Sequence, residues 1–166
     1  MIRLLATRSA DARFKNVHSL GVGSYIARTR ELLCSARSTA TVVSPWIDEE
    51  GIRLLIECWD ARDSSDVQWR LFVRQVDRPL ARAARGKPWK LYQYQRSPAE
   101  GGPPFGMHAK VVLADEDAAA VGSMNLLRAS LYSNLEVGAD LQDRVMARQL
   151  ARLVYWLQTV STNVKT

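Results

Sequence analysis

The sequence predicts an α/β fold, a sandwich built around a mixed, largely parallel sheet. Runs with strand-like alternation and runs with helix-like periodicity follow one another from about residue 24 onward, which is typical of that fold class. A length of 166 residues fits one domain, and 47% hydrophobic with 24% charged residues is ordinary for a protein with a real core. We expect residues 1–20 to form an N-terminal arm or a short first element and residues 21–166 to form the single domain.

Helices and strands alternate through the first half of that domain. A helix is expected from Ser24, and the β-branched residues of TATVVSPWI, residues 39–47, predict a buried strand. In residues 49–62, apolar side chains recur at helical spacing after an acidic start, which predicts an amphipathic helix. Residues 66–74 alternate apolar and polar side chains, as a strand does. The residues that carry these two patterns are Ile52, Leu55, Ile56 and Trp59 for the helix, and Val67, Trp69, Leu71 and Val73 for the strand.

The second half of the chain continues the alternation with shorter elements. It closes with a helix whose first turn Asp140 is expected to cap. The apolar stripe of that last helix is predicted to consist of Met146, Leu150, Leu153 and Leu157. The elements expected before it are a helix at 77–85, strands at 89–95, 108–115, 118–123 and 134–141, and a Pro/Gly loop at 97–106.

The charge balance favours an anionic partner. The formal net charge is +6 and the pI about 9.7, so nucleic acid, anionic membrane surfaces and acidic small substrates are all candidates. The sequence contains no apolar run long enough for a signal peptide or a membrane span, so we expect a cytoplasmic protein without a membrane partner. Cys34 and Cys58 lack the spacing of zinc ligands and are expected to be two buried thiols in a reducing compartment.

One stretch, HAKVVLADEDAAAVGSMN at residues 108–125, carries the chemistry. It holds a His-x-Lys pair, an Asp after four further residues, and Gly-Ser-x-Asn after six more. This spacing resembles the signature of the phospholipase D superfamily at every defined position, and a glutamate follows where single-motif bacterial nucleases of the superfamily also place one. The resemblance implies a phospholipase D-like α/β/α sandwich and a phosphodiesterase. The matching residues are His108, Lys110, Asp115, Gly122, Ser123, Asn125 and Glu136.

The residue types in this motif suit phosphoryl transfer. On a strand, His108 and Lys110 would project from one face, whereas Asp115 would lie on the other face at the mouth of a turn. An imidazole can attack phosphorus and form a phosphohistidine, while an ammonium and an amide can hold the phosphoryl oxygens. A carboxylate hydrogen-bonded to the other imidazole nitrogen would fix the tautomer, and Glu136 is the natural candidate.

The resemblance implies a metal-independent mechanism, and the sequence holds no cluster of metal ligands, so we expect neither metal nor cofactor. Ser123 is expected to bond to the substrate or to the active-site network. Asp115 is expected to brace the turn, and Gly122 belongs to the structural part of the motif. The residues to which the resemblance assigns the catalytic roles are His108, Lys110, Asn125 and Glu136.

The number of histidines predicts a homodimer. The superfamily's reaction uses two His-x-Lys units, one histidine attacking and the other protonating the leaving group, and this chain has one unit. The other histidine, His18, is followed by Ser19 and Leu20 and is expected to belong to the surface or the arm. The resemblance implies that single-motif chains pair about a two-fold axis, so the active site is expected to be shared between two copies.

A basic stretch precedes the motif and is predicted to bind nucleic acid by tracking its phosphates. Several of its arginines recur at three- and four-residue steps, so a helix could present them on one face. The interleaved Trp69, Trp89, Tyr92 and Tyr94 could stack on bases or simply fill the core, and Trp46 and Trp59 are expected to be core. The basic residues are Arg70, Arg74, Arg78, Arg82, Arg85, Lys87 and Lys90.

Three functions follow from these patterns. The first is a homodimeric, metal-independent endonuclease that cleaves DNA or RNA through a phosphohistidine. The second is a non-catalytic or weakly catalytic nucleic-acid-binding subunit of a larger bacterial DNA-modification or defence complex. The third is a phospholipid phosphodiesterase or phosphatidyltransferase, which the small size and the single motif disfavour.

Overall fold

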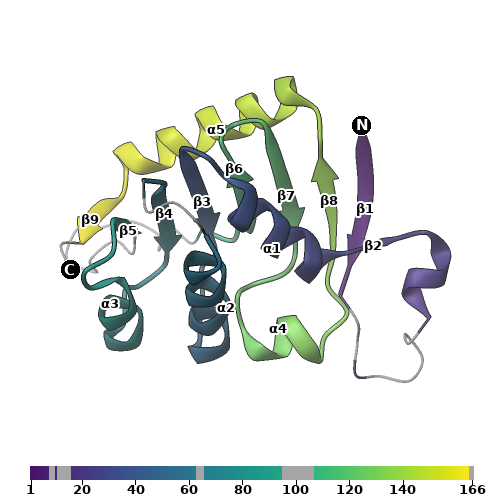
Figure 1. Ribbon diagram of the computed structural model, residues 1–166, viewed down its shortest axis with the longest axis horizontal. Coiled ribbons are helices and arrows are strands. Elements are labelled where there is room, and N and C mark those ends of the chain that lie inside the picture. Colours follow the sequence, from purple (N-terminus) through teal and green to yellow (C-terminus); the bar gives the residue numbers. More distant parts are fainter. Residues whose placement is uncertain (8–9, 11–15, 63–65, 95–106, 165–166) are drawn as a thin grey trace.

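The sheet lies between two layers of helices (Figure 1). The structure is a computed structural model that describes residues 1–7, 10, 16–62, 66–94 and 107–164. The loop predicted at residues 97–106 lies outside the described residues.

Within the described residues, nine strands form one mixed sheet in the order β2-β1-β8-β7-β6-β3-β4-β5-β9. The predicted α/β/α sandwich with a mixed sheet is confirmed, but parallel pairing is confined to β1–β2 and β3–β4–β5. Strands β6 and β7 pair antiparallel because a short turn returns the chain beside itself, and β7 and β8 pair antiparallel across a longer connection that contains a helix. The strands are β1 (Ile2–Ala6), β2 (Gly23–Ser24), β3 (Thr39–Val43), β4 (Gln68–Val73), β5 (Trp89–Gln93), β6 (Val111–Ala114), β7 (Ala118–Gly122), β8 (Val137–Leu141) and β9 (Thr162–Val164).

The segment expected to be an arm or a short first element contributes β1, which lies inside the sheet between β2 and β8. Residues 2–6 therefore belong to the same sheet as the domain predicted for residues 21–166. Neither β2 nor β9 was predicted, since strands of two or three residues carry too little alternation to be recognised.

Polar side chains fix where most helices begin. Ser24, Asp48, Asp77 and Asp143 each accept a hydrogen bond from a backbone N–H in the first turn of the helix that follows. The expectation that Asp140 caps the last helix is wrong, because Asp140 is buried in β8 and pairs with Arg28. The helices are α1 (Tyr25–Ser35), α2 (Glu49–Asp60), α3 (Arg78–Ala84), α4 (Arg128–Tyr132), α5 (Arg144–Thr159) and a 3-10 helix (Val17–Leu20).

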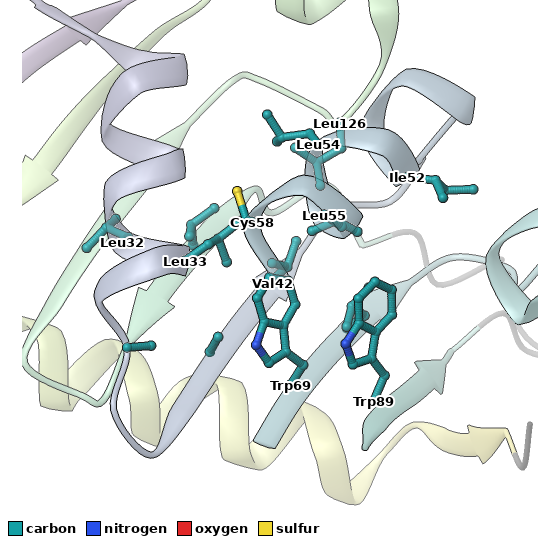
Figure 2. Packing of buried hydrophobic residues seen from close by; sticks show 14 of the residues in the cluster. Leu32, Leu33, Val42, Ile52, Leu54, Leu55, Cys58, Trp69, Trp89 and Leu126 are labelled. Carbon is teal, nitrogen blue, oxygen red and sulfur yellow. The ribbon is translucent and has the colours of Figure 1, made fainter. Parts of the chain in front are cut away.

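One face of the sheet packs against α1, α2 and α3 (Figures 1 and 2). Trp69 and Trp89 stack with ring centroids 5.4 Å apart, and Trp59 of α2 meets both rings edge-on. Both stacked tryptophans are buried, and so are Tyr92 and Tyr94. These four aromatic side chains therefore fill the core, and the base-stacking interpretation of them is wrong.

The other face packs against α5, which crosses the sheet from the β8 side to the β9 side (Figure 1). The predicted apolar stripe of this helix is wrong in part, since Met146 and Leu153 are exposed. The surface beneath α5 includes small side chains such as Ala119, so small residues of the helix can approach it closely. The side chains that α5 buries are Ala147, Ala151, Val154 and Leu157.

Part of this second face stays uncovered at the β1–β8 side of the sheet. In the antiparallel register, Leu4 pairs with Ala139 and Ile2 with Leu141, so these side chains point to the α5 side. Ile2, Leu4 and Val137 are 57%, 67% and 57% exposed. We call these three residues the open sheet face.

The two cysteines differ in environment. Cys58 is buried, but Cys34 is exposed, which corrects the expectation of two buried thiols. Cys34 lies on α1, where its Sγ is 3.9 Å from the backbone oxygen of Cys58. Burial raises the pKa of the Cys58 thiol to about 12.

Candidate active site

His108 and Lys110 lie at the start of β6 and contact each other. Nζ of Lys110 is 2.9 Å from Nδ1 of His108 and donates to the backbone oxygen of the same histidine at 2.7 Å. Lys110 is buried, whereas His108 is exposed. The regular strand begins at Val111 rather than at residue 108, yet the Lys110 carbonyl still accepts from Gly122 across to β7. The pair is therefore held just before β6, at the end of the strand, and the imidazole is exposed to solvent.

Ser123 and Glu136 meet where β7 ends and β8 begins. The Ser123 hydroxyl donates to the Glu136 carboxylate and accepts from the Val137 N–H at 3.1 Å. Thr7, directly after β1, accepts from the Glu136 N–H through its own hydroxyl at 2.8 Å. Sequence reasoning missed Thr7 because a threonine in an arm-like segment carries no signal of its own. Its role comes from β1 pairing with β8.

The buried charges of the site influence one another. Burial lowers the pKa of Lys110, and the nearby Glu136 carboxylate partly opposes this shift. Tyr25, at the start of α1, has its pKa raised above the usual range by burial and, secondarily, by Glu136. Lys110, Glu136 and Tyr25 thus share one electrostatic environment, and Tyr25 was not recognised as part of it from the sequence.

Close packing against Tyr25 requires glycine at two neighbouring positions. A Cβ on Gly122 would lie less than 3.0 Å from the Val137 carbonyl oxygen, the Gly138 Cα and the Tyr25 hydroxyl. A Cβ on Gly138 would meet the Val121 carbonyl oxygen and the Tyr25 ring at similar range. The glycine that precedes Ser123 therefore lets β7, β8 and α1 approach closely enough to set the position of that serine.

The partners of His108 and Glu136 differ from those expected. Within the described residues, Nδ1 of His108 lies against the Lys110 amine, and the Glu136 carboxylate accepts from Ser123. The predicted hydrogen bond between Glu136 and the imidazole is therefore not formed. Glu136 is held in the sheet through Ser123 and Thr7, whereas His108 lies in the exposed segment before β6.

Asn125 carries an unused acceptor. Its side-chain Oδ1 is buried and has no hydrogen-bond partner within the described residues. The next residue, Leu126, is fixed by its N–H to the Ser44 hydroxyl at 3.1 Å and by its carbonyl to the Asp48 N–H at 3.1 Å. The backbone at Asn125 is thus tied to the segment after β3, and Oδ1 is left as a buried acceptor without a partner among the described residues.

Asp115 lies at the opposite end of β6 from His108. Its carboxylate accepts from the backbone N–H groups of Arg37, Ser38 and Thr39 at 2.6–2.8 Å, and from the Ser38 hydroxyl. Burial alone would raise the pKa of Asp115, but these hydrogen bonds outweigh it and the pKa is lowered. Asp115 and Glu116 adopt left-handed backbone conformations, as the tight turn into β7 requires. Asp115 therefore joins this turn to the loop before β3.

Trp46, which the sequence favoured as a core residue at the end of a strand directed toward the site, lies beside the histidine. The residue is 41% exposed, and its ring meets the His108 imidazole edge-on, with centroids 6.0 Å apart. The Arg74 guanidinium lies 5.8 Å from the centroid of the same ring. Trp46 and Arg74 line a cavity of about 410 Å³ at the ends of β3 and β4. The expectation that Trp46 belongs to the core is wrong, because the chain turns outward at Pro45.

The seven predicted nucleic-acid-binding residues do not share one surface. Arg74 follows β4 and precedes α3, so the helix does not carry it. Arg70 lies over the Tyr155 ring of α5 at 5.0 Å, and Lys87 lies over the Trp89 ring at 5.8 Å. Arg78 and Arg82 line a separate cavity of about 490 Å³ between α2 and α3. Of the seven, Arg74 lies next to Trp46. Arg85, directly after α3, and Lys90, on β5, are both exposed.

The comparisons with known proteins agree with this arrangement. A family model described as "Cardiolipin synthase, PLD-like domain" matches residues 30–157. The chain belongs to the phospholipase D-like family. This membership supports a function of the phosphodiesterase type in general.

Solved structures share the whole fold at low sequence identity. NucT from Helicobacter pylori is 13% identical with a TM-score of 0.70, and the match covers 99% of each chain. Nuc from Salmonella typhimurium, described as a phospholipase D family member, is 13% identical with a TM-score of 0.65, covering 100% of this chain and 99% of its own. TrmBL2, an archaeal chromatin protein, is 15% identical with a TM-score of 0.57, covering 98% of this chain and 54% of its own. No curated protein sequence matches the chain.

Within the described residues, no group of three or more His, Cys, Asp and Glu side chains is arranged to hold a metal ion. In the same part of the chain, no helix has the length and apolar character needed to cross a membrane. His18 lies in the 3-10 helix, with Nδ1 3.1 Å from the Val22 carbonyl oxygen.

Proposed function

We propose that this protein is a metal-independent phosphodiesterase that cleaves nucleic acid, DNA or RNA, as an endonuclease. The observation that carries the proposal is the contact between Lys110 and the exposed His108. Asn125 and the Ser123–Glu136 pair belong to the same motif and complete the candidate site. The overall basic charge of +6 favours a polyanionic substrate.

The chemistry follows from the two ring nitrogens of His108. Nε2 of His108 has no hydrogen-bond partner among the described residues and is the attacking atom in this proposal. Attack from Nε2 requires the ring proton on Nδ1, so the Lys110 ammonium has to leave Nδ1 and turn to a phosphoryl oxygen when the substrate binds. In the proposed reaction a bond forms between Nε2 and phosphorus while the bond from phosphorus to the leaving oxygen breaks. A second imidazole gives its proton to that oxygen, and it then takes a proton from the water that hydrolyses the phosphohistidine. Lys110 and the Asn125 amide group hold the non-bridging oxygens.

The second imidazole is His108 of another copy of the chain in this proposal. The only other histidine, His18, lacks a lysine two residues later. The open sheet face supports pairing of two copies, because Val137 belongs to it and also bonds through its backbone to Ser123. Further apolar side chains are exposed on α5, where Leu153 is 53% and Trp156 52% exposed. Of these apolar residues, Val137 adjoins Ser123, which belongs to the site that a second copy would have to complete.

A second candidate function is a nucleic-acid-binding subunit without catalysis, in a larger modification or defence complex. The similarity to TrmBL2 favours it, since that structure is described as showing a novel mode of DNA binding. In this alternative, Lys110 and Asn125 would bind backbone phosphate, and His108 would contribute no chemistry.

A cleavage assay with matched histidine variants separates the two. Purified protein is incubated with labelled single- and double-stranded DNA and RNA in excess EDTA, beside His108→Ala and His18→Ala. We expect cleavage by the wild type and by His18→Ala, and none by His108→Ala. Binding without cleavage by all three proteins would instead support the non-catalytic subunit. Cleavage that EDTA abolishes would refute the metal-independent mechanism.

A further inference from the structure

Trp46 is an exposed aromatic side chain that contacts the candidate nucleophile, His108. Three of the five tryptophans, Trp59, Trp69 and Trp89, pack together in or against the core. Trp46 instead meets His108 edge-on and leaves 41% of its surface exposed. Its contact with the motif histidine, rather than its exposure alone, distinguishes Trp46 from the other tryptophans.

The loop that carries Trp46 is fixed on two sides. The Ser44 N–H donates to the Phe72 carbonyl at 3.0 Å and the Arg74 N–H to the Pro45 carbonyl at 3.1 Å, which ties the loop to β4. The Ser44 hydroxyl donates to the Trp46 carbonyl at 2.8 Å and accepts from the Leu126 N–H. Since Leu126 follows Asn125, these hydrogen bonds fix the backbone at Trp46 relative to the motif. The indole is therefore preorganised relative to the reacting groups.

The cavity beside Trp46 has the size and polarity of a ligand subsite. Its volume of about 410 Å³ falls within the range of small-molecule pockets. Gln75 and Asp77 line it together with Arg74, which supplies hydrogen-bond donors and acceptors beside the ring. The carboxylate of Asp77 would repel a phosphate inside the cavity, whereas an uncharged heteroaromatic ring would not be repelled. Arg74, exposed at the rim, can meet a phosphate outside.

We propose that Trp46 and the cavity beside it bind an unpaired nucleobase next to the phosphodiester that His108 attacks, with Arg74 contacting an adjoining phosphate. This inference rests on the proposed function and specifies its substrate as single-stranded nucleic acid. A base that stacks on Trp46 has to leave its own duplex stack, so a duplex would first have to open. The subsite is independent of base sequence in its stacking part, because every base presents a π face.

Binding measurements with and without bases test the proposal. Fluorescence anisotropy is measured for labelled short oligothymidylate and for an abasic oligomer of equal length and charge, in a His108→Asn background that prevents cleavage. Trp46→Ala is expected to weaken oligothymidylate binding by about 5- to 150-fold, the range for loss of one base–aromatic stack, and to leave abasic binding unchanged. Trp46→Phe should retain most of the preference, and Trp46→Leu, which keeps apolar volume, should lose it.

Arg74→Gln and Tyr132→Ala are the companion variants. Arg74→Gln should weaken binding of both oligomers equally and reduce the salt dependence by about one phosphate contact. Tyr132 is 48% exposed on α4 and does not line the cavity, so Tyr132→Ala should change neither affinity. Circular dichroism checks that every variant is folded.

Equal weakening of both oligomers in Trp46→Ala, or no weakening of either, would overturn the inference. So would wild-type protein that binds the two oligomers equally or binds neither. These outcomes are separate from those of the cleavage assay. If the protein cleaves DNA through His108 but does not depend on Trp46, the proposed function stands and only the subsite is refuted. If the protein binds oligothymidylate more tightly than the abasic oligomer through Trp46 but never cleaves, the subsite stands and the endonuclease function is refuted.

Discussion

The side-chain nitrogen of Lys110 lies 2.9 Å from Nδ1 of His108, and it is buried while the imidazole is exposed. A buried ammonium is costly unless nearby groups compensate it. In the proposed reaction the charge of Lys110 serves catalysis, although its burial opposes folding. The lowered pKa of Lys110, caused by burial and partly opposed by Glu136, expresses the same conflict.

Replacing Lys110 by Met should abolish cleavage while leaving the melting temperature equal to or higher than that of the wild type. The apolar side chain removes the buried charge and keeps most of the volume. Lys90→Met, on an exposed position of β5, is the matched control and should keep its activity. Thermal unfolding by circular dichroism and EDTA-resistant cleavage are the two measurements.

The pH dependence of that comparison has a definite sign. A lysine with a lowered folded-state pKa binds fewer protons when folded than when unfolded between that pKa and the ordinary value of about 10.4, so wild-type stability rises with pH there. Any advantage of Lys110→Met should therefore shrink as pH rises through that window. An advantage that grows with pH, or a large loss of stability at neutral pH, would contradict this account of Lys110.

Mixing of subunits should show whether the active site is shared. Wild-type protein and His108→Ala are unfolded together and refolded in equal amounts, so that pairs form at random. If both histidines are needed for one site, activity falls to about one quarter of the all-wild-type value, against about one half if each chain acts alone. Mixing wild type with His18→Ala should preserve full activity. A linear dependence on the wild-type fraction would exclude the shared site.

Asp115→Asn should destabilise the protein without removing the chemistry. The carboxylate accepts from three consecutive backbone N–H groups, and an amide cannot replace both oxygens, so we expect a loss of about 1–3 kcal/mol. Urea unfolding measures the loss, and cleavage per folded molecule should be nearly unchanged. Asp117→Asn is the control, since Asp117 makes only partly exposed ion pairs, and it should change stability by less than about 1 kcal/mol.

Acid should remove this difference. Because the folded-state pKa of Asp115 is lowered, its stabilisation is fully present above the ordinary carboxyl pKa of about 3.9 and is lost as pH falls through the folded value. Wild type and Asp115→Asn should therefore converge in stability in acid. A gap that widens on acidification would contradict the hydrogen-bonded carboxylate.

Gly122→Ala should impair both folding and cleavage. The added Cβ would collide with backbone of β8 and with the Tyr25 hydroxyl, so we expect a loss of about 1–3 kcal/mol and displacement of Ser123. Gly86→Ala is the control, because nothing lies within 4 Å of its Cβ position and its φ of 73° adds strain of only about 1 kcal/mol. Melting curves and cleavage rates should separate the two. Unchanged cleavage in Gly122→Ala would mean that Ser123 is not positioned by this contact.

The sequence predicted the features that depend on local residue patterns, namely individual helices and strands and the motif. The alternation of apolar residues located β4, the helical spacing located α2, and the motif spacing located the segment from His108 to Asn125. Trp46 could not be placed in this way, because a tryptophan after a buried strand looks the same whether the chain turns inward or outward at the proline. Thr7 was equally invisible, since its contact with Glu136 depends on pairing between strands more than a hundred residues apart.

The apolar stripe of α5 illustrates another limit. Large residues at helical spacing usually face the core, yet here the small residues Ala147 and Ala151 do so and Leu153 faces outward. Which stripe is buried depends on the size of the side chains beneath the helix and on what else covers the sheet. Neither can be read from the helix sequence alone.

His108 and Asp115 stand at opposite ends of a strand of four residues, Val111–Ala114, one beside the reacting groups and the other clamping a distant loop. The motif therefore consists of two separable parts, a candidate catalytic pair and a structural clamp. A variant that lost the imidazole would keep the hydrogen bonds of Asp115 to the loop before β3. In a related chain, the aspartate would therefore indicate the fold, and only the histidine and lysine would indicate the proposed catalytic activity.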